Sequence, residues 1–150
     1  IRELSALLGV PARGAEMAAR FERRLESIAP TRLGDDALYV GPVGGQLYGG
    51  TRGTNYHDVL IAAGLRDAAA DAGYEGWPVY GAETVLTLDP SWIVTPAEHA
   101  EGFCARPGFD VLQACVADQV IGIEGRVLND PGWGMLDAAE ALHHAVRAAR

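Results

Sequence analysis

A short helix that ends at a proline and leads directly into an apolar strand constrains the fold of this chain more than any other feature. It occupies residues 78–95, with the sequence PVYGAETVLTLDPSWIVT. The apolar face of the predicted helix is formed by Val85, Leu86 and Leu88. Asp89 precedes a proline, which disfavours continuation of the helix. Residues 92–95 are apolar and partly β-branched, which is typical of a strand that is covered on both faces.

The rest of the chain alternates between predicted helices and strands. Helices are expected over residues 2–29 (with a break at Gly9-Val10-Pro11), 56–63, 110–117 and 135–149, and another begins after Thr95. Strands are expected over residues 37–41, 92–95 and 119–123, with a further candidate at 77–80, while residues 68–73 suit a turn or a single helical turn. This alternation predicts an α/β fold: a small, open, mainly parallel sheet flanked by helices.

Capping residues locate two of the helix boundaries. Thr54 or Asn55 is expected to cap the helix over residues 56–63, and Gly64 suits the left-handed position that ends it. Thr95-Pro96-Ala97-Glu98 has the form of a capping box with proline at the first helical position. Asp130-Pro131-Gly132 is expected to form a turn before the last helix.

The composition excludes several classes of function. A chain of 150 residues with 49% apolar residues fits one globular domain. The net charge of −8 disfavours nucleic-acid and anionic-membrane surfaces, and no apolar run has the length of a membrane span. All twelve basic residues are arginine, which excludes a phosphate-binding or Schiff-base lysine. The chain begins at Ile1 without a signal sequence, so the compartment cannot be read directly from it.

The spacing of Cys104 and Cys115 does not decide between a disulfide and two buried thiols. An exported protein permits the disulfide. We expect Cys104 and Cys115 to be two buried free thiols.

A long glycine-rich loop, PVGGQLYGGTRGTNY, follows the first predicted strand and precedes a helix. Open α/β sheets bind ligands at this position, and glycine lets the backbone approach another group closely. The loop matches no phosphate-binding motif. Arg52 could grip an anionic group, and aromatic side chains could form a wall for a large planar ligand. The predicted ligand-binding residues are Gln46, Tyr48, Arg52, Tyr56, Trp77 and Tyr80.

Two clusters suggest metal binding or acid–base chemistry. The first is His57 with Asp58, and the second comprises Glu98, His99, Glu101 and Cys104. Neither matches a zinc spacing, so no metal and no cofactor are expected. The three serines lack a nucleophile motif, and the pair His143-His144 is expected at the surface. We therefore expect no catalytic residues and no enzyme activity.

The segment GAETVLTLDPSWIVT resembles a signature of class III substrate-binding proteins of ABC importers, which deliver iron-siderophores, haem or cobalamin. LLG near the N-terminus, DVLIAAGL, RPGFDVLQAC and VIGIEG, and the final AAEALHHAV extend the resemblance to the end of the chain. The resemblance implies two Rossmann-like α/β lobes joined by a long helix, with the ligand held between them. Residues 1–29 then correspond to the end of the interlobe helix, and residues 30–150 to the C-terminal ligand-binding lobe.

The same resemblance implies partners and a location. The ligand would be a metal chelate or tetrapyrrole, and the missing N-terminal lobe would complete the cleft. Glu83 stands where this family docks a glutamate into arginine pockets of the membrane permease, and a carboxylate near a helix start is also favoured by the helix dipole. The full-length protein would be periplasmic, or lipid-anchored outside the cell.

The sequence is also compatible with two other functions. One is a small α/β enzyme or metal-handling domain that uses His57 and Asp58 together with Glu98 and His99. The other is an interaction domain that has lost ligand binding.

Overall fold

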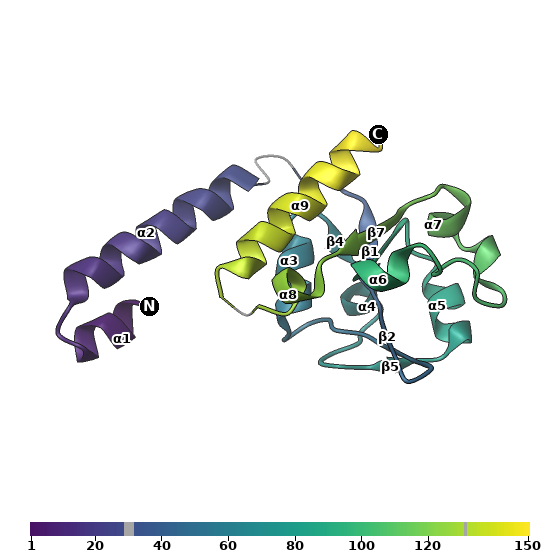
Figure 1. Ribbon diagram of the computed structural model, residues 1–150, viewed down its shortest axis with the longest axis horizontal. Helices are drawn as coiled ribbons and strands as arrows, with labels where there is room; N and C mark the ends of the chain where they lie inside the picture. The colour runs from purple at the N-terminus through teal and green to yellow at the C-terminus, as the bar shows by residue number, and fades with distance from the viewer. Residues whose placement is uncertain (29–31, 131) are drawn as a thin grey trace.

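Four parallel strands form the centre of the computed structural model, which describes residues 1–28, 32–130 and 132–150 (Figure 1). In order across the sheet they are β4 (Arg66–Asp67), β1 (Asp36–Tyr39), β6 (Trp92–Pro96) and β7 (Val120–Ile123). The predicted α/β fold with a parallel sheet is confirmed. Strand β4 was not predicted, because a strand of two residues is too short to show a periodicity of two.

Helices cover both faces of this sheet, and the alternation of side chains along each strand assigns residues to one face or the other. Ala37, Trp92 and Val94 pack on one side, beneath α3 (Asn55–Ala62), α8 (Gly125–Leu128) and α9 (Gly134–Ala148). Leu38 and Ile93 pack on the other side, beneath α4 (Ala68–Asp71), α5 (Ala82–Leu88), the 3₁₀ turn η1 (Phe109–Val111) and α7 (Gln113–Val116). The strand β6 is therefore buried on both faces, as predicted.

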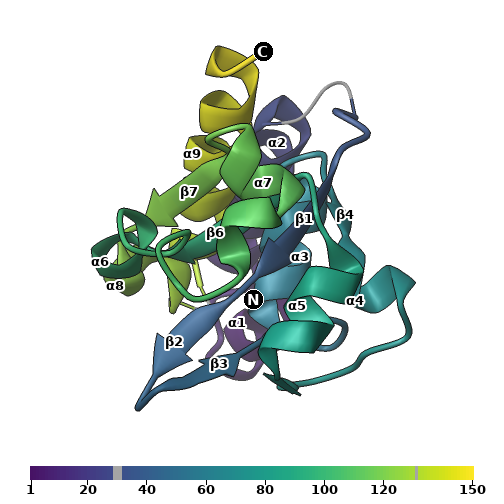
Figure 2. The same ribbon diagram turned by 90° about the vertical axis from the view of Figure 1, so that its right-hand side faces the viewer.

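A second, antiparallel sheet follows β1 and occupies the region predicted as a long loop. Its strands are β2 (Gly41–Val43), β3 (Gln46–Tyr48) and β5 (Val79–Tyr80), seen at the bottom of Figure 2. Gly44 and Gly45 connect β2 to β3 with φ values of 58° and 83°. Two successive positive φ angles suit a tight hairpin turn, so the Gly-Gly pair carried a signal that the loop interpretation missed. The candidate strand at 77–80 exists, but it belongs to this second sheet.

The helices α1 (Arg2–Leu7) and α2 (Pro11–Ile28) form an arm that projects from the rest of the molecule (Figure 1). The predicted break between them is confirmed. Arg24 ties the arm to α9 through ion pairs with Asp137 at 2.5 Å and Glu140 at 2.6 Å. The proposed boundary between residues 29 and 30, like the proline of the predicted turn at 130–132, lies outside the described residues.

The helix and strand of residues 78–95 form as predicted. Helix α5 ends at Leu88. The next residue, Asp89, adopts a left-handed conformation with φ of 36°, and its Oδ1 accepts a hydrogen bond of 2.8 Å from the backbone N–H of Gln113. The predicted capping box is wrong: β6 extends through Pro96, paired with Ile123, so Thr95 stays in the strand. The short helix α6 (Ala97–Ala100) starts one residue later than the box requires.

Other local expectations also need correction. Cys104 and Cys115 form a disulfide with a Cα–Cα distance of 5.6 Å, so the expected free thiols are wrong. The chain between them folds back through η1, a geometry that spacing alone could not reveal. His143 is buried and its Nδ1 contacts the carbonyl of Ala63 at 2.9 Å, whereas only His144 lies at the surface.

The helix over residues 56–63 is confirmed as α3. Gly64 is left-handed with φ of 88°, as predicted. Thr54 occupies the N-cap position, but its hydroxyl donates to the carbonyl of Thr51 instead of capping a helical N–H. None of the helices in the described part of the chain combines the length and the apolar character that crossing a membrane requires.

Candidate ligand-binding face

The order of the parallel strands creates a topological switch point between β1 and β6. The chain leaves β1, forms β4 on one side of it, and then crosses to β6 on the other side. Connections that diverge in this way leave a crevice at the carboxyl ends of the two strands, where open α/β sheets bind ligands. At this edge β1 leads into β2, and β6 leads into α6.

Three aromatic residues form a row at the switch point. The ring of Tyr39 stacks on that of Tyr56 with 3.7 Å between centroids, and Trp77 meets Tyr56 edge-on at 5.3 Å. Tyr39 and Tyr56 are each 6% exposed, whereas Trp77 is 61% exposed. The hydroxyl of Tyr56 donates to Oδ1 of Asn129. Trp77 is thus the exposed end of an aromatic row whose other two rings are fixed by packing.

The environment of Tyr39 brings Glu98 into the same region. The pKa of Tyr39 lies well above its usual value, chiefly because the ring is buried, and further because of its hydrogen bond with Tyr56 and the negative charge of Glu98. Tyr39 therefore remains a neutral phenol at physiological pH. Glu98 lies in the first turn of α6, immediately beyond the carboxyl end of β6.

Close packing against tyrosine rings accounts for two of the glycines in this segment. A Cβ at Gly49 would lie 2.5 Å from the ring of Tyr80, and one at Gly50 would lie 2.3 Å from the ring of Tyr56. The predicted close approach of the backbone therefore exists, but the group approached is a tyrosine of the same chain. These contacts fix the rings beneath the face.

The outer face of the small sheet is exposed and largely apolar. Tyr48 and Val79 lie opposite each other in the β3–β5 register and are 36% and 56% exposed. The hydroxyl of Tyr48 donates to Oε1 of Gln46 at 2.7 Å. Tyr48, Gln46 and Val79 thus form a second exposed group.

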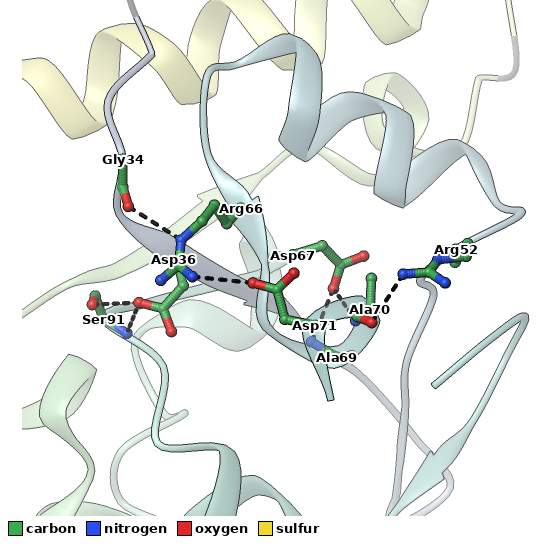
Figure 3. A network of polar contacts seen from close by, with 9 residues as sticks. All are labelled: Gly34, Asp36, Arg52, Arg66, Asp67, Ala69, Ala70, Asp71 and Ser91. Carbon is green, nitrogen blue, oxygen red and sulfur yellow. Dashed lines mark hydrogen bonds and ion pairs between the residues drawn. The ribbon is translucent and has the colours of Figure 1, made fainter. Parts of the chain in front are cut away.

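Asp67 anchors the strand end next to β1. It is 2% exposed, and its Oδ1 accepts hydrogen bonds of 3.0 and 3.1 Å from the backbone N–H groups of Ala69 and Ala70 (Figure 3). Its Oδ2 accepts from the hydroxyl of Thr51 at 2.6 Å and contacts Nδ1 of His57 at 2.8 Å. A buried carboxylate with four partners holds the glycine-rich segment, α3 and α4 together.

Arg52 lies beside this network rather than free over the face. Its guanidinium donates to the carbonyl of Ala70 at 3.1 Å, near the end of α4 (Figure 3). Its backbone pairs with Glu75 in an isolated bridge. One of its donors is therefore already used within the protein.

The structure divides the six predicted ligand-binding residues into separate groups. Gln46 lies against Tyr48, and Tyr56 lies against Trp77. Tyr56 and Tyr80 are nearly fully buried, so their rings serve packing and do not form an exposed aromatic wall. The hydroxyl of Tyr80 has no hydrogen-bond partner among the described residues. Ligand contact by the exposed members stays a prediction.

Sequence reasoning missed three residues of this region. Tyr39 and Asn129 complete the aromatic row, and Asp67 fixes the backbone beneath it. Asp67 stands directly before Ala-Ala-Ala, the position of a helix N-cap, and that pattern could have identified it. Nothing local in the sequence connects Tyr39 or Asn129 to the face.

The two clusters considered for metal or acid–base chemistry do not assemble a site. Within residues 1–28, 32–130 and 132–150, no three His, Cys, Asp or Glu side chains converge to hold a metal ion. Cys104 is bonded to Cys115, and His57 contacts buried Asp67. His57 and Asp58 border a cavity of about 380 Å³ between α2, α3 and α9, whose other walls are apolar.

Glu83 lies in the first turn of α5 and is exposed. No hydrogen bond or ion pair to its carboxylate is formed within the described residues. It borders a hollow of about 350 Å³ together with Tyr74 and Thr87. The carboxylate is therefore accessible to a partner.

No protein-family model and no curated protein matches this chain. Solved structures do match. A periplasmic binding protein from Veillonella parvula superposes with a TM-score of 0.83 at 18% identity, over 98% of this chain and 54% of that protein. An ABC-type Fe³⁺-hydroxamate transport system protein from Saccharomonospora viridis superposes with a TM-score of 0.79 at 22% identity, over 97% and 53%. The periplasmic vitamin B12 binding protein of Vibrio cholerae gives 0.76 at 22% identity, over 94% and 55%.

These similarities confirm the α/β lobe fold that the sequence resemblance implied for this chain. The described chain has the architecture found in periplasmic binding proteins, over nearly all of its length. It spans little more than half the length of each of the three matched proteins.

Proposed function

We propose that this chain is the C-terminal lobe of the substrate-binding component of an ABC importer, and that it binds a metal chelate or tetrapyrrole without catalysing a reaction. The observation that carries the proposal is the exposed Trp77, supported by two buried tyrosines at the switch point of a periplasmic-binding-protein fold. An exposed aromatic ring on a rigid base suits a flat, partly apolar ligand. Matched proteins that carry iron-hydroxamate or vitamin B12 in their names support this ligand class.

A second lobe would complete the ligand cleft. The matched proteins are nearly twice as long as the part of them that this chain covers. The arm formed by α1 and α2 would then be the end of the helix that joins the lobes. Tyr48, Gln46 and Trp77 would face the ligand from this side of the cleft, and Arg52 would contribute those of its donors that Ala70 does not occupy.

The disulfide supports the proposed location outside the cytoplasm. Disulfides persist in oxidising compartments such as the periplasm and the cell surface. Cys104 and Cys115 are bonded to each other here, as such a compartment would allow.

Ligand binding can be tested by thermal shift on the full-length gene product with haem, a ferric hydroxamate and vitamin B12. A ligand at about one hundred times its Kd should stabilise the protein by about 2.7 kcal/mol. Trp77→Ala should weaken binding at least fivefold without lowering the melting temperature of the free protein, because the indole is mostly exposed. Val116→Ala, an exposed position on α7, is the matched control. If none of the three ligands shifts the melting temperature, the proposal is wrong.

Glu83 is the proposed contact with the permease. Charge reversal in Glu83→Arg should abolish transport in cells and leave ligand affinity unchanged, because the carboxylate would pair with permease arginines and not with the ligand. Glu16→Arg on α2 is the matched control for a change of the same charge at another exposed site. A loss of affinity equal to the loss of transport would contradict this role.

A further inference from the structure

Negative charge is concentrated in the body of the molecule. Residues 30–150 contain seven arginines and sixteen aspartates and glutamates, a formal net charge of −9, whereas residues 1–29 carry +1. The ligand-binding face therefore belongs to a strongly acidic lobe. A field of this sign repels anions and attracts cations over several ångströms.

Carboxylates also lie close to the aromatic row itself. Glu98 lies in the first turn of α6, directly after β6, and the β6 residue Val94 is paired with Tyr39. Glu75 lies in the segment that pairs with Arg52 and leads to Trp77. Both side chains are exposed, and neither has an ion-pair partner among the described residues.

The nearby arginines offset only part of this negative charge. Arg52 keeps its positive charge while it donates one N–H to the carbonyl of Ala70 (Figure 3), and its backbone pairs with that of Glu75. Arg126, in the helix that follows β7, pairs with Glu124 at 2.5 Å. An anionic ligand would therefore meet one arginine, Arg52, beside two exposed carboxylates, Glu75 and Glu98.

We infer that the ligand-binding face selects its ligand by charge: it accepts a chelate or tetrapyrrole that combines a flat apolar surface with a neutral or positive periphery, and it disfavours anionic ones. This inference rests on the proposed function and specifies the ligand of the same site. Trp77 supplies affinity by packing against the flat surface of the ligand, while Glu98 and Glu75 discriminate between ligands of different charge. Since exposed charges act through solvent, the preference weakens as ionic strength rises.

The test uses ligands that differ only in charge. A ferric trihydroxamate with a free ammonium group, its N-acetylated neutral form and its N-succinylated anionic form are titrated into the full-length gene product. Ferric protoporphyrin and its dimethyl ester, which lacks the two propionate charges, form a second pair. At low salt the ammonium form should bind about tenfold more tightly than the succinylated form, and the ester more tightly than the diacid. Half-molar salt should remove most of each difference.

Two charge-neutralising variants locate the source of the preference. Glu98→Gln should reduce the ratio of cation to anion affinity about two- to fivefold, which is the range for a single exposed charge. Asp118→Asn makes the same change of charge at the opposite edge of the sheet, just before β7, and should leave the ratio unchanged. The far-ultraviolet circular dichroism of both variants should match that of the unsubstituted protein.

The outcomes separate this inference from the proposed function. Equal binding of all charge forms, or tightest binding of an anionic form, overturns charge selection and leaves a binding protein. If Glu98→Gln and Asp118→Asn change the ratio of cation to anion affinity equally, the assignment of the charge preference to the ligand-binding face is also overturned. Absence of binding by every ligand in both series and by vitamin B12 overturns the proposed function itself.

Discussion

The arm and the body differ in the burial of their apolar side chains. In the body, Leu38 and Ile93 are fully buried between two layers of helices. In the arm, Leu4 is 62% exposed, Leu7 85% and Leu8 69%. Both regions have regular backbone structure, but only the body has a core of its own. An apolar surface of this extent on a helical pair usually marks a contact with another element.

The difference shows which part of the chain carries its own stability. Helices α3 and α9 are held by an apolar cluster that includes both sheet and helix residues. Helix α2 is joined to the body through the ion pairs of Arg24, an edge-on contact of 5.6 Å between the rings of Phe21 and Trp133, and the buried Ile28 at its end. Helix α1 makes no side-chain hydrogen bond or ion pair with the body among the described residues. Substitutions should therefore have large effects in the body and small effects in the arm.

Matched leucine substitutions should show the largest contrast. Leu38→Ala removes a fully buried side chain from β1 and should lower the free energy of unfolding by about 3–5 kcal/mol. Leu7→Ala makes the same chemical change at an exposed position and should alter it by less than about 0.5 kcal/mol. Urea denaturation followed by circular dichroism measures both values. Comparable losses would show that the arm is packed against the body in solution.

Loss of the disulfide should be the next largest effect. The bond between Cys104 and Cys115 closes a segment with a sequence separation of 11, for which the loop-entropy relation gives about 3 kcal/mol. The double substitution of both cysteines by serine should lower the free energy of unfolding by that amount. Reductant should have the same effect on the unsubstituted protein and none on the double variant. A denaturation midpoint that does not respond to reductant would contradict the prediction.

Asp67→Ala should destabilise the body by about 2 kcal/mol, because it removes a helix cap and leaves the buried hydroxyl of Thr51 without its acceptor. Asp71→Ala removes an exposed carboxylate that pairs with Arg66, and should cost less than about 0.5 kcal/mol. Chemical denaturation of the two variants tests the difference. Equal costs would mean that the buried network contributes nothing beyond a surface ion pair.

The smallest effect is expected where the arm joins the body. Arg24→Gln removes both ion pairs with α9 and should change global stability by less than about 1 kcal/mol, since all the partners are partly exposed. Its signature should be faster amide hydrogen exchange in α2, with exchange in β1 and β6 unchanged. Arg23→Gln, one residue earlier, is the control. Faster exchange throughout the sheet would show that the arm supports the core.

Prediction from the sequence succeeded where the signal was local. The proline after Asp89 and the apolar run at 92–95 located α5 and β6, and the alternation of elements gave the fold class. It failed where non-local pairing decided the outcome. Pairing with Gly122 kept Thr95 in a strand, and pairing between β3 and β5 turned a predicted loop into a sheet.

The candidate site was harder to predict than the fold, for the same physical reason. Residue type indicated that Tyr56 and Trp77 belong to one region, and the structure places them in contact. Their burial could not be read from the sequence, because it depends on Tyr39, Gly50 and Asn129, which lie far from one another along the chain. Free thiols were expected in place of the disulfide because two positions in a sequence carry no distance.

The glycines that lie against tyrosine rings have a consequence for how such a surface can change during evolution. Gly49 and Gly50 cannot gain a side chain without displacing Tyr80 or Tyr56, so the backbone beneath the face tolerates little mutation. Trp77, Tyr48 and Gln46 are exposed, so replacing them disturbs the packing less than adding a side chain at Gly49 or Gly50 would. A lineage of such proteins could therefore acquire new ligands by exchanging the exposed side chains while the supporting frame is inherited unchanged.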